Sequence, residues 1–239
     1  MKILPLAFTI LSLLASWFAS GQHFMQPMNP EELILSKSAY AVTVQGDTIR
    51  GKIRMSNLTN GQLRSFTIRD DQKQKYKFKA KDVITLAVRP SVMSKLTSAF
   101  SIPTTWGKSG MIRFNDVLDR EWVYFDRALL PRKKNKYALL QLVNPGFASK
   151  IKVYNDPRAR KNTGLGMDGG GLLLGLEDRS FFVVFDNNKS QIYRQSSYNR
   201  NARNELYKDC PVFMENYSGE RFNWRDFPEH VFVYDQLCD

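Results

Sequence analysis

The sequence predicts an α+β fold, with a mostly antiparallel β body followed by a small C-terminal helical segment. Between residues 39 and 197, short runs of β-branched and aromatic residues alternate with polar or glycine-containing turns, which is typical of a meander, a sandwich or a partial barrel. After residue 197, apolar residues recur at spacings of three and four, which is typical of helices. With 43% hydrophobic and 13% aromatic residues, the chain is rich enough to bury a core.

The first 21 residues have the three-part layout of a secretory signal peptide. A positive charge at Lys2 precedes a long apolar run, which small residues close. Ala19 and Gly21 suit the two pockets of signal peptidase, which predicts cleavage before Gln22. The alternative is a transmembrane anchor, which polar residues within the run disfavour. We therefore expect an exported protein, periplasmic, extracellular or associated with the outer membrane, with no transmembrane span after cleavage.

The predicted mature chain begins with a leader over residues 22–38, in which one helical turn is expected. The β body, residues 39–197, opens with the strongest local signal of the sequence. Two β-rich runs flank a turn that contains Gly46 and Asp47, which predicts a hairpin.

Residues 75–81 predict a strand in which side chains alternate between two faces. Tyr76, Phe78 and Ala80 would face one way and four lysines the other. The next strand, 83–88, is expected to close a meander. Further strands are expected at 65–68, 111–116, 121–130, 136–143, 148–156, 180–186 and 190–195, with a Ser/Thr-rich connector at 90–110 and a glycine-rich loop insertion at 155–179.

Residues 198–239 predict a helical tail that packs on the β body. In its first half Leu206, Cys210 and Phe213 would share one helix face, and Pro211 predicts a kink or a break between two helices.

A last helix is expected after Asp226 as N-cap, with Pro228 in its first turn. Residues 230–234 are also compatible with a strand. The chain has two cysteines, Cys210 and Cys238, and in an exported protein an even number favours a disulfide. Two buried free thiols are the alternative.

Several of these stretches occur together in a known group of proteins. The chain contains YAVTVQGDTIRGKI, KYKFKAKDV and, near its end, ELYKDCPVF and YDQLCD. In this order they resemble uncharacterised exported proteins of Bacteroidota-type bacteria, in which a GDTxxGKI hairpin opens the mature chain and a DCP helix closes it. The resemblance implies compartment and fold and carries no catalytic residues. The glycine-rich stretch departs from it, as an insertion between two strands.

Gly164, Gly166 and Gly169 have the G-x-G-x-x-G spacing of a dinucleotide-binding turn. Such a turn needs a strand directly before it and a helix directly after it. Here a polar segment separates the glycines from the preceding strand, and further glycines oppose a following helix. A flexible loop is the better interpretation, and we expect no nucleotide or other cofactor.

The residues that most hydrolases and zinc enzymes require are scarce. His23 and His230 are the only histidines, and paired cysteines would leave too few ligands for zinc. Four carboxylates lie close together in the chain: Asp116, Asp119, Glu121 and Asp126. Ion pairs with neighbouring arginines are the simplest interpretation, and a calcium site or a glycan hydrolase that uses two of these carboxylates is the alternative. No metal site is predicted.

The formal net charge of +12, which becomes +11 once Lys2 leaves with the signal peptide, favours an anionic partner. The candidate anion-binding residues are Lys75, Lys77, Lys79, Lys81, Arg132, Lys133, Lys134, Arg158, Arg160 and Lys161. The alternative for the first four is protection of an edge strand. We expect a non-enzymatic envelope module that binds a protein, an anionic polysaccharide or a lipid headgroup through a basic face. Export, and the lack of stacking aromatics beside the lysines, argue against nucleic acid.

Overall fold

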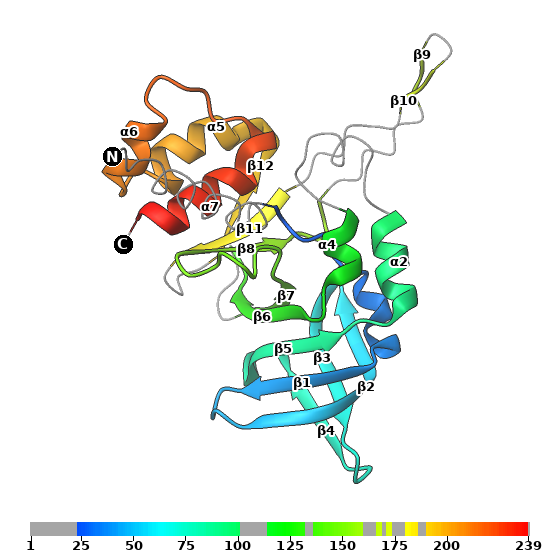
Figure 1. Ribbon diagram of the computed structural model, residues 1–239. Coiled ribbons are helices and arrows are strands. Elements are labelled where there is room, and N and C mark those ends of the chain that lie inside the picture. The colour runs from blue at the N-terminus through cyan, green and yellow to red at the C-terminus, as the bar shows by residue number, and fades with distance from the viewer. Residues whose placement is uncertain are drawn as a thin grey trace, which may run out of the picture.

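The computed structural model describes residues 23–100, 114–131, 136–159, 166–168, 171–173, 180–185 and 190–238. The elements form three layers: a β-barrel, a smaller second sheet, and a group of helices from the C-terminal part of the chain (Figure 1). The predicted class is confirmed, because a mostly antiparallel β body is followed by a small helical segment.

Six strands close into a barrel and a seventh extends it. The strands are β1 (Ser38–Thr43), β2 (Thr48–Thr59), β3 (Gln62–Arg69), β4 (Lys75–Lys79), β5 (Val83–Arg89), β6 (Val123–Leu129) and β7 (Tyr137–Gln141). Their order in the sheet is β2-β1-β5-β6-β7-β3-β4, and a pairing of β2 with β3 closes the ring. β4 pairs with β3 at the open end of this order, so it is an edge strand.

The interior of the barrel is apolar, and alternate residues of its strands point into it. Ala41, Ile53, Ile68, Leu86 and Phe125 are among the buried residues of this core. The long strand β2 pairs with both β1 and β3, and Gly51 lies where it bends between them. A Cβ there would lie 2.3 Å from the carbonyl oxygen of Arg69, so only glycine allows this approach.

The predicted hairpin at the start of the β body is confirmed by the pairing of β1 with β2. Gly46 in its turn has a φ of +94°, which glycine adopts without strain. The prediction that residues 83–88 close a meander is wrong. β5 pairs with β1 and β6, and not with its chain neighbour β4, because the ring closes only when β5 returns to the first strand.

The second sheet lies between the barrel and the helices. It contains β8 (Ile151–Asn155), β11 (Ser180–Phe185) and β12 (Gln191–Arg194), in the order β12-β11-β8. Phe182 and Val184 pack against residues of β6 and β7 on the outside of the barrel. Phe181 and Val183 face the other way, toward the helices. β11 is thus buried on both faces, which explains its uninterrupted apolar sequence.

The predicted glycine-rich insertion does connect two paired strands, β8 and β11. Within it, β9 (Gly166–Asp168) and β10 (Gly171–Leu173) pair as a short antiparallel hairpin, which the sequence did not predict. Gly164 and Gly169 lie outside the described residues.

The helical segment contains α5 (Tyr198–Asn201), a π-helical turn (Ala202–Leu206), α6 (Pro211–Asn216) and α7 (Phe227–Leu237), with single 3-10 turns at Gln195–Ser197 and Trp224–Asp226. Leu206, Cys210 and Phe213 are buried together, but they do not share one helix face as predicted, because the chain breaks after the π-helical turn and α6 begins at Pro211. α7 is a helix and not the alternative strand. Asp226 occupies its N-cap position without a capping side-chain hydrogen bond.

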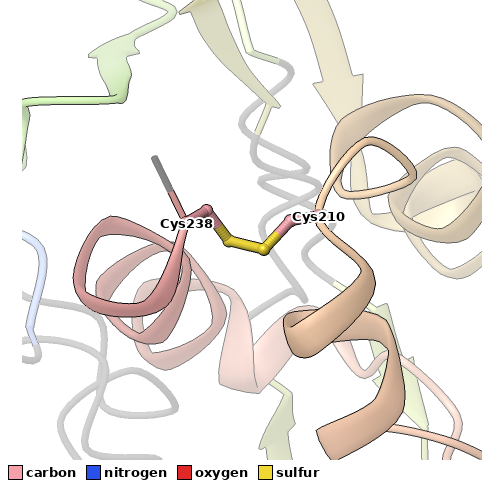
Figure 2. Close-up of a disulfide and its surroundings, with 2 residues drawn as sticks. All are labelled: Cys210 and Cys238. Carbon is pink, nitrogen blue, oxygen red and sulfur yellow. A yellow bond between two sulfur atoms is a disulfide. The ribbon is translucent and has the colours of Figure 1, made fainter.

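A disulfide joins Cys210 at the start of α6 to Cys238 at the end of α7 (Figure 2). The Cα atoms lie 5.8 Å apart. The predicted bond is therefore present, and it ties the last helix of the chain to the preceding one.

The N-terminal leader is part of the core. Phe24 is buried among the side chains beneath α7, and Met28 and Leu33 are buried with the barrel interior. The backbone NH of Met25 donates to the carbonyl of Val143 over 2.7 Å. The predicted helical turn is a 3-10 helix at Pro30–Leu35.

Two helices occur where the sequence predicted other structures. α2 (Val92–Phe100) lies in the supposed connector, and α4 (Phe114–Asp119) occupies residues 114–116 of the supposed strand at 111–116, of which residues 111–113 lie outside the described ranges. α2 buries Ser94, Ser98 and Ala99 and leaves its large apolar side chains Val92, Met93 and Phe100 exposed, so the side that packs against the protein does not carry the usual apolar pattern. The apolar run before Asp116 is too short for its periodicity to separate strand from helix.

Candidate anion-binding surface

The lysines of β4 project from the outer face of the barrel. Lys75, Lys77 and Lys79 are exposed, whereas Tyr76 and Phe78 between them are half-buried. The rings of Phe78 and Phe66 lie 5.2 Å apart, which places the apolar face of β4 against the barrel. The predicted alternation is confirmed over these five residues.

The prediction that four lysines lie on one strand is wrong for Lys81. Lys81 is exposed but lies in a 3-10 turn, Ala80–Asp82, rather than in the strand. The strand ends because the carboxylate of Asp82 accepts a 3.4 Å hydrogen bond from the backbone NH of Lys79 and so stabilises the turn.

Two further cations on neighbouring strands extend this surface. Lys52 on β2 is directly opposite Arg69 on β3, and Arg69 is directly opposite Lys75 on β4. Their chain neighbours Ile53 and Ile68 are opposite one another inside the barrel, so all three cations face outward. We define the basic face as Lys52, Arg69, Lys75, Lys77 and Lys79.

Within the described ranges, no carboxylate forms an ion pair with a member of the basic face. Asp70, at the turn between β3 and β4, instead accepts hydrogen bonds from the backbone NH of Gln74 and the hydroxyl of Tyr76. Directly opposite residues lie about 4.5–5.5 Å apart, and like charges there are mutually destabilising. The row Lys52–Arg69–Lys75 therefore concentrates positive charge without neutralising it.

Lys52 and Arg69 were not predicted as members of this surface, although the sequence contains a signal for their position. Asn60 and Gly61 both have positive φ and form the turn between β2 and β3. Pairing residues outward from this turn places Lys52 opposite Arg69. Arg54 on β2 and Arg64 on β3 are each an extra, bulged residue, and the two shifts cancel.

The remaining predicted basic residues are only partly described. Arg132, Lys133, Lys134, Arg160 and Lys161 lie outside the described ranges. Arg158 is exposed, and its backbone NH donates to Asp156 over 3.0 Å. Burial lowers the pKa of Arg64, and the nearby charge of Arg158 lowers it further. Since Arg64 precedes Ser65, which is opposite Lys79, positive charge continues beyond this end of the basic face.

The clustered carboxylates have separate structural environments. Glu121 forms a 2.7 Å ion pair with Arg89 at the surface. Asp126 is buried where the second sheet covers the barrel, and it accepts hydrogen bonds from Thr85 over 2.5 Å and from Tyr154 over 3.3 Å. Burial, and secondarily Asp126, raise the pKa of Tyr154, which keeps its hydroxyl protonated as a donor.

The spacing of Glu121 and Asp126 does not favour a glycosidase pair. Along an extended chain, five residues span roughly 16 Å, so Glu121 and Asp126 are farther apart than the roughly 5–10 Å of glycosidase pairs. Asp116 and Asp119 lie on α4 instead.

His230 is a buried core residue of α7. Its Nδ1 lies 2.9 Å from the hydroxyl of Tyr198, which lies 3.0 Å from that of Tyr207. Burial raises the pKa of both tyrosines, so they stay neutral. Burial also lowers the pKa of His230 to about 4, although Asp226 opposes this shift. His230 is thus held neutral by its surroundings and is a packing residue.

Acid should destabilise the protein through His230. In the unfolded chain its pKa returns to about 6.5, so between pH 6.5 and 4 only the unfolded state binds this proton, and stability falls as pH falls. The loss at pH 4 should reach about 3 kcal/mol. Urea unfolding at several pH values, compared with His230→Gln, measures it, since glutamine keeps a hydrogen bond to Tyr198 without titrating. Parallel pH profiles for the two proteins would contradict this prediction.

Among the residues that the structure describes, no group of three or more His, Cys, Asp or Glu side chains is placed to hold a metal ion. No helix in this part of the chain is long and apolar enough to cross a membrane. Comparison of the chain with family models, curated proteins and solved structures gives no match. Fold and surface together define the protein as a β-barrel with a disulfide-linked helical segment and a cationic outer face.

Proposed function

We propose that this protein is an exported, non-enzymatic module of the bacterial envelope that binds an anionic polysaccharide through the basic face. The observation that carries the proposal is the row of directly opposed cations, Lys52–Arg69–Lys75, across three adjacent strands.

Protection of the sheet edge explains only part of this surface. Lysines on β4 are expected under that alternative, because β4 is the edge strand. Arg69 on β3 is paired on both sides, with Lys52 on β2 and with Lys75 on β4. Arg69 therefore protects no edge, and its repulsion with Lys52 and Lys75 lowers stability unless an anion neutralises it.

The shape of the array favours a polymer over a single headgroup. Along β4 the lysines recur every second residue, roughly 7 Å apart, and across the strands the cations recur roughly every 5 Å. A linear polyanion reaches several of these charges at once, whereas one phosphate reaches one or two. Each exposed contact contributes at most about 1 kcal/mol to the binding free energy, and several such contacts made by one polymer together give a measurable affinity.

The experiment compares binding of the purified protein to polygalacturonate with binding of Lys75→Gln/Lys77→Gln/Lys79→Gln. The triple variant should bind about tenfold to a hundredfold more weakly at low salt, since it loses three exposed charge contacts. Lys52→Gln/Arg69→Gln should also weaken binding. Uncharged dextran should not bind.

The matched control is Arg194→Gln/Arg200→Gln/Lys208→Gln, which removes three exposed cations from the second sheet and the helical segment. It makes the same change in net charge and should bind as the unaltered protein does. Equal weakening in both triple variants would show a net-charge effect and contradict a specific face. Binding that is unchanged at high salt would also contradict the proposal, because salt screens exposed charges.

A further inference from the structure

Three large aromatic side chains lie on the outer face of the barrel, away from its core. Tyr40 on β1 and Tyr124 on β6 are half-buried, as is Trp122, which comes just before β6. Their chain neighbours Ala39 and Val123 are buried in the barrel interior, so the three aromatic side chains point the other way. Within the described part of the chain, none of the three belongs to a hydrophobic cluster of the core. We call Tyr40, Trp122 and Tyr124 the aromatic group.

Strand pairing places two of these rings over one small residue. Tyr40 is directly opposite Ala87 on β5, and Ala87 is directly opposite Tyr124. Burial raises the pKa of Tyr124, and the charge of Tyr40 and a hydrogen bond to it raise this pKa further, so the two hydroxyls lie close together. Because two strand spacings amount to roughly 10 Å, the hydroxyls meet only if both rings lean across Ala87. Ala87 is accordingly 0% exposed, and the rings lie along the sheet as a flat apolar surface.

Two further side chains lie against the ring of Tyr40. The ring centroid of Trp122 is 5.2 Å from that of Tyr40. Arg50 on β2 is directly opposite Tyr40, and its guanidinium carbon lies 5.4 Å from the centroid of the tyrosine ring. Arg50 is exposed, and no carboxylate of the described residues forms an ion pair with it. An exposed cation is thus held beside the aromatic group.

The aromatic group and the basic face belong to one continuous surface. They meet on β2, which pairs with β1 through its first residues and with β3 through the rest. Gly51 is directly opposite the buried Ala39, and Ile53 is buried in the barrel core, so the intervening Arg50 and Lys52 both face outward. Two residues of one strand are roughly 7 Å apart. A polymer that contacts Lys52 can therefore continue over Arg50 onto the aromatic group.

We infer that the aromatic group and Arg50 form a subsite for a uronic acid unit of the polysaccharide, an inference that rests on the proposed function. The C–H face of a pyranose ring packs on the flat face of an aromatic side chain, because its partly positive hydrogens meet the negative π face. A uronic acid carries its carboxylate on the same ring, where the guanidinium of Arg50 binds it. A polyanion without sugar rings contacts only the cations. The subsite therefore adds selectivity for acidic sugars to the general attraction of charge.

The test compares the binding of polygalacturonate with the binding of polyphosphate, a polyanion without sugar rings. Trp122→Leu should weaken polygalacturonate binding about fivefold to tenfold and leave polyphosphate binding unchanged, since leucine removes the ring without altering charge. Tyr217→Leu is the matched control, because Tyr217 is a half-buried aromatic residue that follows α6 in the helical segment. It should bind both polymers as the unaltered protein does. Circular dichroism verifies that each variant is folded at the temperature of the measurement.

Tryptophan fluorescence of the unaltered protein tests the same contact without a destabilising substitution. Polygalacturonate should shift the emission to shorter wavelength, because a stacked sugar ring removes water from the indole of Trp122, and polyphosphate should not. Trp122→Phe should lose this shift and keep most of the affinity, since phenylalanine retains a flat ring.

Several outcomes would overturn the inference and leave the proposed function standing. Trp122→Leu binds polygalacturonate as well as the parent does, it loses affinity for both polymers equally, or polygalacturonate causes no emission shift. A single-stranded oligonucleotide that binds more tightly than polygalacturonate, and that Trp122→Leu releases, would assign the subsite to nucleic acid instead. Unchanged polygalacturonate binding by the triple lysine variant of β4 would contradict the proposed function itself, and the subsite with it.

Discussion

Replacing Phe24 by alanine should lower the free energy of unfolding by about 3–5 kcal/mol, as expected for a fully buried phenylalanine. Phe24 is 1% exposed although it stands near the beginning of the described chain. Its ring centroid lies 5.2 Å from that of Phe181 and 5.3 Å from that of Phe227, so it bridges the second sheet and α7. The substitution would leave a cavity between these layers, and urea unfolding followed by circular dichroism measures its cost.

Phe100→Ala supplies the control for this change. Phe100 is exposed, so the same loss of a ring should change the unfolding free energy by less than about 0.5 kcal/mol. If Phe24→Ala were as harmless as Phe100→Ala, the leader would not be part of the folded core.

Removing the disulfide should have the next largest effect. Cys210 and Cys238 are 28 residues apart in the chain. Closing such a loop lowers the conformational entropy of the unfolded chain, which raises the free energy of unfolding by about 3–4 kcal/mol. Cys210→Ala/Cys238→Ala should therefore unfold at a clearly lower urea concentration. Alanine is preferred to serine because both positions are buried, and a hydroxyl would add its own cost.

Reducing the disulfide in the unaltered protein distinguishes the effect of losing the bond from the effect of replacing the two cysteine side chains. Reduced protein should lose stability similarly, and a reductant should have no effect on the double variant. A reductant that shifts both proteins equally, or neither, would be inconsistent with a stabilising bond between these two cysteines.

The strands that the sequence predicted share a local cause. The β1–β2 hairpin follows from its turn around Gly46, and β11 from the apolar run Ser180–Phe185. α7 likewise follows from its own start signals, with Pro228 in the first turn. In each case the residues that decide the conformation lie within a few positions of one another.

The predictions from sequence are wrong where residues far apart in the chain determine the local structure. The buried side of α2 carries two serines, and Ser98 bonds to Arg120, which comes twenty residues after the helix ends. The residues near α2 in the sequence therefore do not indicate which side of the helix is buried. β5 pairs with β1 rather than β4 because the barrel must close.

The same division applies to the basic face. The alternation of β4 is a property of five consecutive residues, and it was predictable. The presence of Lys52 and Arg69 beside Lys75 depends on two registers, β2 with β3 and β3 with β4. One bulge without its compensating partner would have turned Lys52 to the other face of the sheet. The local sequence pattern therefore determined which side chains of β4 lie on the same face. Which cations of neighbouring strands lie side by side depends on strand register, and only tertiary packing sets that register.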